Sequence, residues 1–312
     1  MLFGPEGFGQ GAQDLRQEGD ARLARSAGAG GEGGQADLFS RHRCPFRVAA
    51  SRKRAHPACL KAIIQRRLRE CQDRGVVESA AEAELEPPTP REVIDLLAAQ
   101  YGELPRRPQR DPVDELVLGV LSQNTSDVNS GRAFERLRRT FPSWQEVVEA
   151  PASQVEEAIR TGGLAPTKSL RIKAMLAEVE KRRGSFDLSF LSEMPLDEAE
   201  SWLTSLPGAG PKTAAVVLLF SLGRPAFPVD THVHRVLRRL GLTAVGASAT
   251  QAQAMWQARL SPDEVYPFHM YLIVHGRRTC VARRPRCPEC SLRHRCPSAK
   301  EFYPNLSAAA AP

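Results

Sequence analysis

A chain of 312 residues with a hydrophobic fraction of 42% is long enough for one large or two moderate domains with real cores. It contains no run of about eighteen apolar residues, which excludes a helical membrane span, and no apolar core of an export signal near the N-terminus. The net charge of +7 is concentrated in residues 41–74, with eleven Lys and Arg against two acidic residues, and in residues 277–295, with seven Arg against one Glu. Such concentrated charge suits a polyanion such as nucleic acid.

The first 85 residues form a leader that is rich in glycine and then in basic residues. Ten of the 23 glycines lie between Gly4 and Gly34 without apolar periodicity, so we predict that the leader is largely disordered.

From residue 90 onward the spacing of apolar residues is helical almost without interruption. Thr89 and Asp111 are each followed by a proline, an arrangement that begins helices, and Ser143 with Glu146 predicts a capping box. No convincing run of alternating β-branched residues occurs, so we predict an all-α fold. Further helices are expected near residues 127–140, 144–149, 152–160, 167–182, 196–205, 211–222, 231–240, 248–260 and 264–276.

The segment Leu206–Thr213 separates two apolar helices and contains a G-x-G pattern. Gly208 and Gly210 are expected to allow a tight turn at positive φ, and Pro211 to begin the second helix, whose unpaired amides bind phosphate. A P-loop is excluded because Pro211 replaces the glycine before its lysine, and a dinucleotide fingerprint because Thr213 replaces its third glycine. A hairpin that grips the DNA backbone remains, beside an ordinary turn between helices.

Lys212 lies in the first turn of that second helix, where the helix dipole disfavours a cation; partial desolvation there would make a neutral, nucleophilic amine available. The alternative is a solvated lysine that contacts phosphate. Eighteen residues later, Asp230 is a candidate N-cap of the next helix. A lysine beside a carboxylate suits substitution at a sugar carbon, because the carboxylate stabilises positive charge at C1′ while the amine forms a Schiff base. His232 and His234 are expected to be structural.

Four of the seven cysteines crowd into one C-terminal segment with the pattern C-x6-C-x2-C-x5-C: Cys280, Cys287, Cys290 and Cys296. Structural zinc more often uses two C-x2-C pairs, whereas a [4Fe–4S] cube needs four separately aimed thiolates, so the spacing favours iron–sulfur over zinc. Arg283, Arg284 and Arg286 lie in the first loop, where a metal-tied backbone would present them to phosphates; a solvated loop is the alternative.

The hairpin, the segment Val229–His232 and the cysteine pattern together resemble endonuclease III, of the helix–hairpin–helix DNA glycosylase superfamily, over residues 90–297. The resemblance implies a helix–hairpin–helix DNA glycosylase fold, with DNA bound across the cleft between two domains. The implied division is a leader at 1–85, a six-helix barrel domain at 110–225, an iron–sulfur cluster domain at 86–109 and 226–300, and a tail at 301–312.

The resemblance also implies that Lys212 is the Schiff-base nucleophile, Asp230 the catalytic carboxylate, and the four cysteines the ligands of a [4Fe–4S] cluster. Such an enzyme removes oxidised pyrimidines from duplex DNA and cleaves the strand 3′ to the abasic site by β-elimination. Its expected partner is double-stranded DNA with damaged bases or abasic sites, contacted also by Gly208 and Gly210. We expect a monomer without membrane association, in the bacterial cytoplasm with the nucleoid.

The residues that fill the space left by a flipped base depart from the family pattern. Aligned on Asp127, the usual plugging glutamine falls at Asn124, with Gln123 one place earlier, while Leu164 matches the apolar wedge. This departure leaves the lesion preference open.

Two alternatives remain. A mismatch-specific adenine or thymine/uracil glycosylase without lyase activity shares the hairpin, the aspartate and the cluster, but usually lacks the lysine. A non-catalytic helix–hairpin–helix DNA-binding protein does not need Lys212 and Asp230 together.

Overall fold

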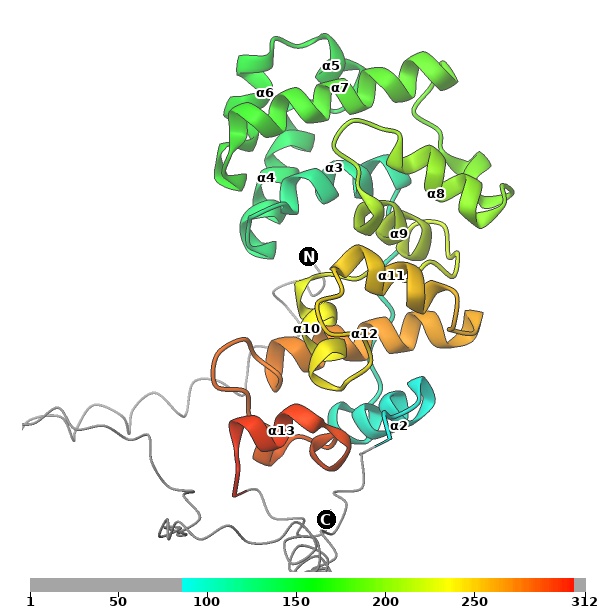
Figure 1. Ribbon diagram of the computed structural model, residues 1–312. Helices are drawn as coiled ribbons and strands as arrows, with labels where there is room; N and C mark the ends of the chain where they lie inside the picture. The colour runs from blue at the N-terminus through cyan, green and yellow to red at the C-terminus, as the bar shows by residue number, and fades with distance from the viewer. Residues whose placement is uncertain (1–85, 306–312) are drawn as a thin grey trace, which may run out of the picture. The chain divides into compact units, whose positions relative to one another are not determined.

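The computed structural model describes residues 86–305, which Figure 1 shows as helices joined by turns. Within this range no β-strand occurs, and the predicted all-α fold is confirmed. No helix in it is long and apolar enough to cross a membrane. The predicted leader and the last residues of the predicted tail lie outside the described range. The α-helices are α2 (Pro90–Tyr101), α3 (Pro112–Ser122), α4 (Asp127–Thr140), α5 (Trp144–Glu149), α6 (Ala152–Ile159), α7 (Ala165–Arg183), α8 (Leu196–Thr204), α9 (Pro211–Phe220), α10 (Thr231–Arg239), α11 (Ala249–Gln257), α12 (Pro262–Arg278) and α13 (Pro297–Phe302), and the 3₁₀ turns are η1 (Arg160–Gly162), η2 (Ser189–Ser192), η3 (Cys287–Glu289) and η4 (Arg293–Arg295).

Local capping explains why several helices begin where the sequence predicts. Thr89 Oγ1 accepts a hydrogen bond from the third amide of α2, and Asp111 Oδ1 accepts one from Val113 N at 2.8 Å, each ahead of a proline. Of the two hydrogen bonds that make up the capping box predicted at Ser143, only one is present. Glu146 N donates to Ser143 Oγ as expected, but the Glu146 carboxylate accepts from the Ser143 hydroxyl instead of from the backbone N–H.

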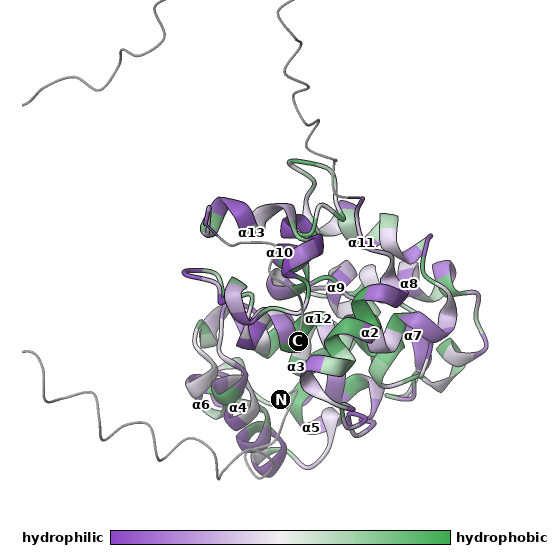
Figure 2. Cartoon of the chain, turned by 90° about the horizontal axis from the view of Figure 1, so that it is seen from below, coloured by the Kyte–Doolittle hydropathy of each residue, from purple (hydrophilic) through white to green (hydrophobic). Residues whose placement is uncertain are grey.

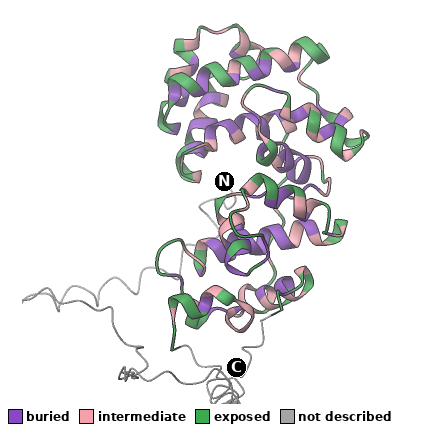
Figure 3. Ribbon diagram, viewed as in Figure 1, coloured by how far each residue is buried: buried purple, intermediate pink, exposed green. Residues whose placement is uncertain are grey.

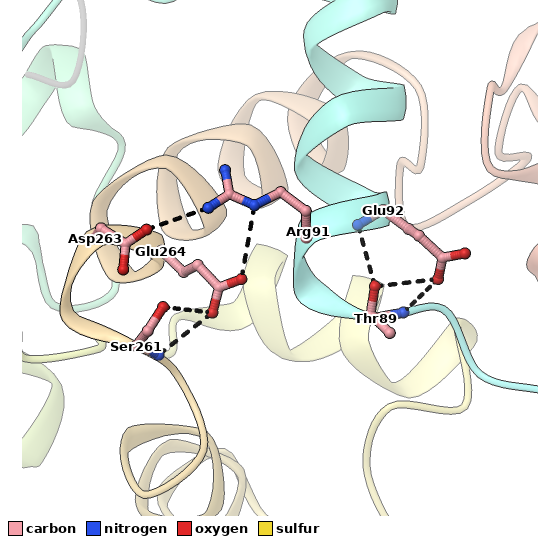
Figure 4. Close-up of polar contacts among 6 residues, drawn as sticks. All are labelled: Thr89, Arg91, Glu92, Ser261, Asp263 and Glu264. Carbon is pink, nitrogen blue, oxygen red and sulfur yellow. Dashed lines mark hydrogen bonds and ion pairs between the residues drawn. The ribbon is translucent and has the colours of Figure 1, made fainter.

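Helices α2 and α12 pack together although they lie far apart in the sequence. Figure 4 shows the polar contacts at the start of both helices. Six residues make them: Thr89, Arg91, Glu92, Ser261, Asp263 and Glu264. Each helix begins with a hydroxyl residue whose backbone N–H donates to a glutamate three positions on. Arg91 joins the two helix starts, at 3.1 Å from Asp263, but both side chains are largely exposed, so this ion pair contributes little to stability.

Two hydrophobic clusters form the core of the described residues. The first is built from α3 to α9 and includes the fully buried Leu116 and Ile172. The second is built from α2, α10, α11, α12 and the cysteine segment, and in it the rings of Phe227 and Phe268 stack with centroids 5.6 Å apart. Helix α9 contributes to both clusters, and Figure 3 shows the buried residues on the inward faces of the helices.

The surface carries the polar residues. Figure 2 shows hydrophilic residues on the outward-facing turns of helices such as α4 and α13, and hydrophobic residues towards the interior. Neighbouring helices cover α3 on nearly all sides, which explains why most of its residues are apolar. The predicted domain boundaries at residues 109/110 and 225/226 stay a prediction.

Candidate active site

A cavity of about 620 Å³ is lined by residues from both core clusters. Lys212 at the start of α9 and Asp230 at the start of α10 both line it. Gln123 and Asn124, from the turn after α3, line it as well. The structure therefore brings together the two residues that the sequence predicts as catalytic and two of the predicted DNA contacts.

The turn before Lys212 has one glycine in the predicted left-handed conformation. Gly208 has φ +83°, a value that favours glycine. The expectation of positive φ at Gly210 is wrong: it is the extended N-cap residue of α9, with φ −100°, because this position only has to lead into the helix. A Cβ added at Gly210 would meet no protein atom within 4 Å, so the backbone there is open to a ligand. Lys212 itself is exposed, so protein atoms alone do not desolvate its amine.

Asp230 is the N-cap of α10, as the sequence predicts. One of its oxygens, Oδ1, accepts hydrogen bonds from His232 N and Val233 N, both at 2.8 Å. These two bonds fix the carboxylate at the helix start, where the dipole favours a negative charge. Among the described residues, Oδ2 has no hydrogen-bond partner, so this oxygen is available to a substrate in the cavity.

His269 is a buried member of the cavity that the sequence does not identify. Its Nδ1 lies 2.9 Å from Pro228 O, and because a carbonyl only accepts, Nδ1 carries the proton. Burial lowers the pKa of His269 to about 4; the Asp230 carboxylate acts in the opposite direction, and the Lys212 and Arg107 cations add to the lowering. The imidazole is therefore neutral at pH 7. The sequence gives no signal because His269 lies inside an apolar helical stretch.

Two ion pairs border the same cavity and were also missed from the sequence. Arg107 Nη2 binds both carboxylate oxygens of Glu115, at 2.9 and 2.8 Å, and both side chains are buried. Arg277 of α12 pairs with Asp127 of α4 at 2.6 Å. The Arg107–Glu115 pair spans only eight residues of the sequence, whereas the Arg277–Asp127 pair joins α12 to α4, which are distant in the sequence.

The two residues predicted as DNA plugs differ in how freely they reach solvent. Gln123 is held at both ends of its amide: Oε1 accepts from Arg171 Nη1 at 3.1 Å, and Nε2 donates to Gly208 O at 3.0 Å. Asn124 is exposed and has φ +54°. Leu164 is also left-handed, with φ +50°, and its side chain is 59% exposed. The geometry favours Asn124 over Gln123 as the polar residue that reaches a partner.

The four cysteines are free thiols that line a second cavity, together with Arg239 and His275. Arg239 Nη1 donates to Cys280 Sγ at 3.2 Å. Burial raises the pKa of the Cys290 thiol to about 12 and that of Cys296 to about 11. Buried thiols of this kind become thiolates only beside a cationic centre. No three Cys, His, Asp or Glu side chains between residues 86 and 305 are grouped to hold one metal ion.

The loop between the first two cysteines is exposed where the sequence predicts DNA contacts. Arg283, Arg284 and Arg286 all face solvent, and Arg284 has φ +53°. Arg286 N donates to Thr279 O at 2.9 Å, which closes the base of the loop. The three guanidinium groups are therefore presented from a loop with a fixed base.

Residues 117–260 match the HhH-GPD superfamily of base excision DNA repair proteins. The chain is 34% identical over 179 residues to endonuclease III of Sulfolobus acidocaldarius, covering 57% of this chain and 78% of that protein. It is 32% identical over 196 residues to endonuclease III of Thermotoga maritima, covering 62% and 85%. A putative DNA glycosylase of Arabidopsis thaliana is 39% identical over 166 residues, but the match spans only 56% of that protein.

Solved structures agree with these relatives. A trapped covalent intermediate of endonuclease III with DNA is 29% identical, with a TM-score of 0.60, and the match covers 69% of this chain and 98% of that one. A thermostable thymine-DNA glycosylase, at 18% identity and a TM-score of 0.54, shares the fold. The helices and the segment Leu206–Thr213 that leads to Lys212, here called the lysine hairpin, thus define a helix–hairpin–helix DNA glycosylase fold. Within that class, the chain belongs to the endonuclease III family.

Proposed function

We propose that this protein is a bifunctional DNA glycosylase and abasic-site lyase that acts as a monomer on double-stranded DNA. It removes oxidised pyrimidines and then cleaves the strand 3′ to the abasic site by β-elimination. The observation that carries the proposal is that Lys212 and Asp230 line one cavity, with a carboxylate oxygen of Asp230 left available. The endonuclease III–DNA complexes among the similar structures support duplex DNA as the partner.

The chemistry follows from these two side chains. The neutral amine of Lys212 attacks C1′ of the damaged nucleotide, the bond from C1′ to the base breaks, and the base leaves with the bonding electrons and takes up a proton. Asp230 balances the positive charge that develops at C1′. The adduct nitrogen then loses one proton, and the bond from C1′ to the ring oxygen breaks as that oxygen takes up a proton, which leaves a protonated imine that acidifies C2′. Loss of a C2′ proton expels the 3′ phosphate and cuts the strand.

The exposure of Lys212 fits an enzyme that completes its site with DNA. Lys212 lies in the first turn of α9 and lines the cavity, and a bound duplex would exclude water from that cavity. A volume of about 620 Å³ is in the range of small-molecule sites and accommodates an extruded nucleotide. Asn124 and Leu164 are the exposed residues placed to fill the vacated space.

We further propose that the four cysteines hold a [4Fe–4S] cluster. Four free thiols around one cavity fit a centre with thiolate ligands, and the Arg239 hydrogen bond to Cys280 would stabilise the charge of such a ligand. When bound, the cluster would tie the Cys280–Cys287 loop covalently and so hold its three arginines in place. Iron analysis and the visible spectrum test the assignment, since a colourless protein with zinc would refute it.

Borohydride trapping tests the lyase reaction. Wild-type protein with abasic duplex DNA is expected to give a covalent product, because borohydride reduces the imine to a stable amine. Lys212→Gln is expected to give none while still binding the duplex. A wild-type protein that binds abasic DNA but forms no product would contradict the lyase and leave the monofunctional glycosylase. A panel of duplexes with single defined lesions then identifies the preferred base.

A further inference from the structure

A buried lysine without an acidic partner lies behind the two turns that carry Asn124 and Leu164. The Lys168 side chain of α7 is only 2% exposed. Its Nζ donates to Leu121 O at 2.7 Å, to Thr125 Oγ1 at 2.7 Å and to Gly162 O at 2.8 Å. These three bonds use every N–H donor of an ammonium group.

Such a lysine is costly for the fold. Burial lowers the pKa of Lys168, and among the described residues no acidic side chain offsets the loss of solvation. A buried cation is tolerated only when its donors are all satisfied. The three acceptors are therefore the reason that the side chain is tolerated here, and they lie in or next to the two turns that carry Asn124 and Leu164.

The acceptors come from two separate segments of the chain. Leu121 and Thr125 flank the turn that holds Asn124, and Gly162 precedes Leu164 by two residues. The Thr125 hydroxyl also bonds Gly162 O, so the two segments are joined directly as well. Asn124 and Leu164 are both non-glycine residues in the left-handed conformation, which persists only where the surroundings hold it.

A second contact from α7 extends this network to the lysine hairpin. Arg171 lies three residues after Lys168, on the same face of the helix. It bonds Gln123 Oε1, and Gln123 Nε2 bonds Gly208 O in the turn before α9. One helix thus holds both turns and, through Gln123, the segment that leads to Lys212.

We propose that Lys168 is a positioning residue that fixes the Ser122–Thr125 turn and the Gly162–Leu164 turn as one rigid unit, so that Asn124 and Leu164 enter the duplex together. The proposal rests on the proposed glycosylase function. It assigns Lys168 to the extrusion of the base and gives it no part in the imine chemistry. Loss of Lys168 therefore affects a paired, stacked lesion far more than an abasic site, where no base has to be extruded.

Lys168→Met tests the proposal, and α7 supplies a matched control. Lys173 also donates to three backbone carbonyls, of Val147, Val148 and Ala150, which belong to α5 and its C-cap and not to the two turns. Lys173→Met removes the same kind of contact and is expected to leave activity unchanged. Thr125→Val serves as a second variant, because it breaks the link from Lys168 to the first turn and retains the cation.

Three measurements are compared under single-turnover conditions: excision of a lesion from a fully paired duplex, borohydride trapping on a preformed abasic site, and the fluorescence of 2-aminopurine beside the lesion. For Lys168→Met we expect roughly tenfold slower excision, a smaller rise in fluorescence, and trapping within about twofold of wild type. Thr125→Val is expected to change in the same direction.

If Lys168→Met and Thr125→Val both fold, and both excise the lesion and raise the fluorescence as wild type does, the proposal is overturned. Equal losses of excision and trapping, or an equal defect in Lys173→Met, would also overturn it, since they indicate a general loss of structure. Failure of the wild-type protein itself to trap abasic DNA would count against the proposed lyase function instead.

Discussion

The close approach of α3 and α9 provides a sharp test of how the lysine hairpin is held. A Cβ added at Gly119 of α3 would lie 2.6 Å from Thr213 Cγ2, the residue after the proposed nucleophile. Gly119→Ala therefore forces one helix away from the other or moves the Thr213 side chain. Thr213 is buried, so it has little room to move. The start of α9, with Lys212, is expected to shift.

Two effects of opposite sign determine the free energy of unfolding. Overpacking in a buried contact costs about 1–3 kcal/mol, whereas replacing a helical glycine by alanine gains up to about 1 kcal/mol. Gly119→Ala is therefore expected to lose about 1–2 kcal/mol. Thr213→Ser removes the clashing methyl group and leaves the nearest Thr213 atoms at 3.5 and 3.6 Å, which is ordinary contact. This change alone loses about 1 kcal/mol of methyl burial.

The double variant Gly119→Ala/Thr213→Ser separates these effects. Independent changes would add to a loss of about 2–3 kcal/mol, but relief of the clash predicts a loss below about 1 kcal/mol. Urea unfolding of the four proteins, with borohydride trapping of each, measures stability and the position of Lys212 together. Additive losses, or a Gly119→Ala protein more stable than wild type, would refute the close packing of the two helices.

Asp230→Asn is expected to keep the fold, because an asparagine oxygen still accepts the two amide hydrogen bonds at the start of α10, and to lose excision with the carboxylate. Asp230→Ala also loses about 1 kcal/mol of capping. Excision by Asp230→Asn at the wild-type rate would contradict this. Burial lowers the pKa of His269 from the usual 6.5 to about 4, so the unfolded chain binds a proton in that interval that the folded protein does not. As the pH drops from 6.5 to 4, the free energy of unfolding is therefore expected to fall by about 3 kcal/mol more in wild type than in His269→Asn. Chemical denaturation measures this difference, and equal pH profiles for the two proteins would contradict the lowered pKa of His269. Cys290→Ser is expected to lower the iron content and the visible absorbance, and unchanged values would argue against Cys290 as a ligand.

The helices could be predicted because their signals are local. Apolar periodicity placed the nine helices between residues 127 and 278 to within three residues at each end, whereas the short α13 was not predicted. Thr89 and Asp111 begin helices through bonds to amides only a few residues away. The two catalytic candidates were also found locally, since the short step from Lys212 to Asp230 brings both to one cavity. Their catalytic roles stay predictions.

The remaining features depend on packing between distant segments. The residues around Lys168 in the sequence are typical of an exposed helix face, and only the fold places this lysine under two turns from other parts of the chain. His269 becomes a cavity residue because α12 packs behind α10. The choice between Gln123 and Asn124 depended on a contact with Arg171, which lies 48 residues away in the sequence.

The most direct test of the central claim is to locate the covalent bond. Wild-type protein is trapped on an abasic duplex with borohydride, and the adduct is mapped by peptide mass spectrometry. A single modified residue, Lys212, is the expected result. Modification of a different lysine, or a stable complex with no adduct, would contradict the assignment of Lys212 as the nucleophile.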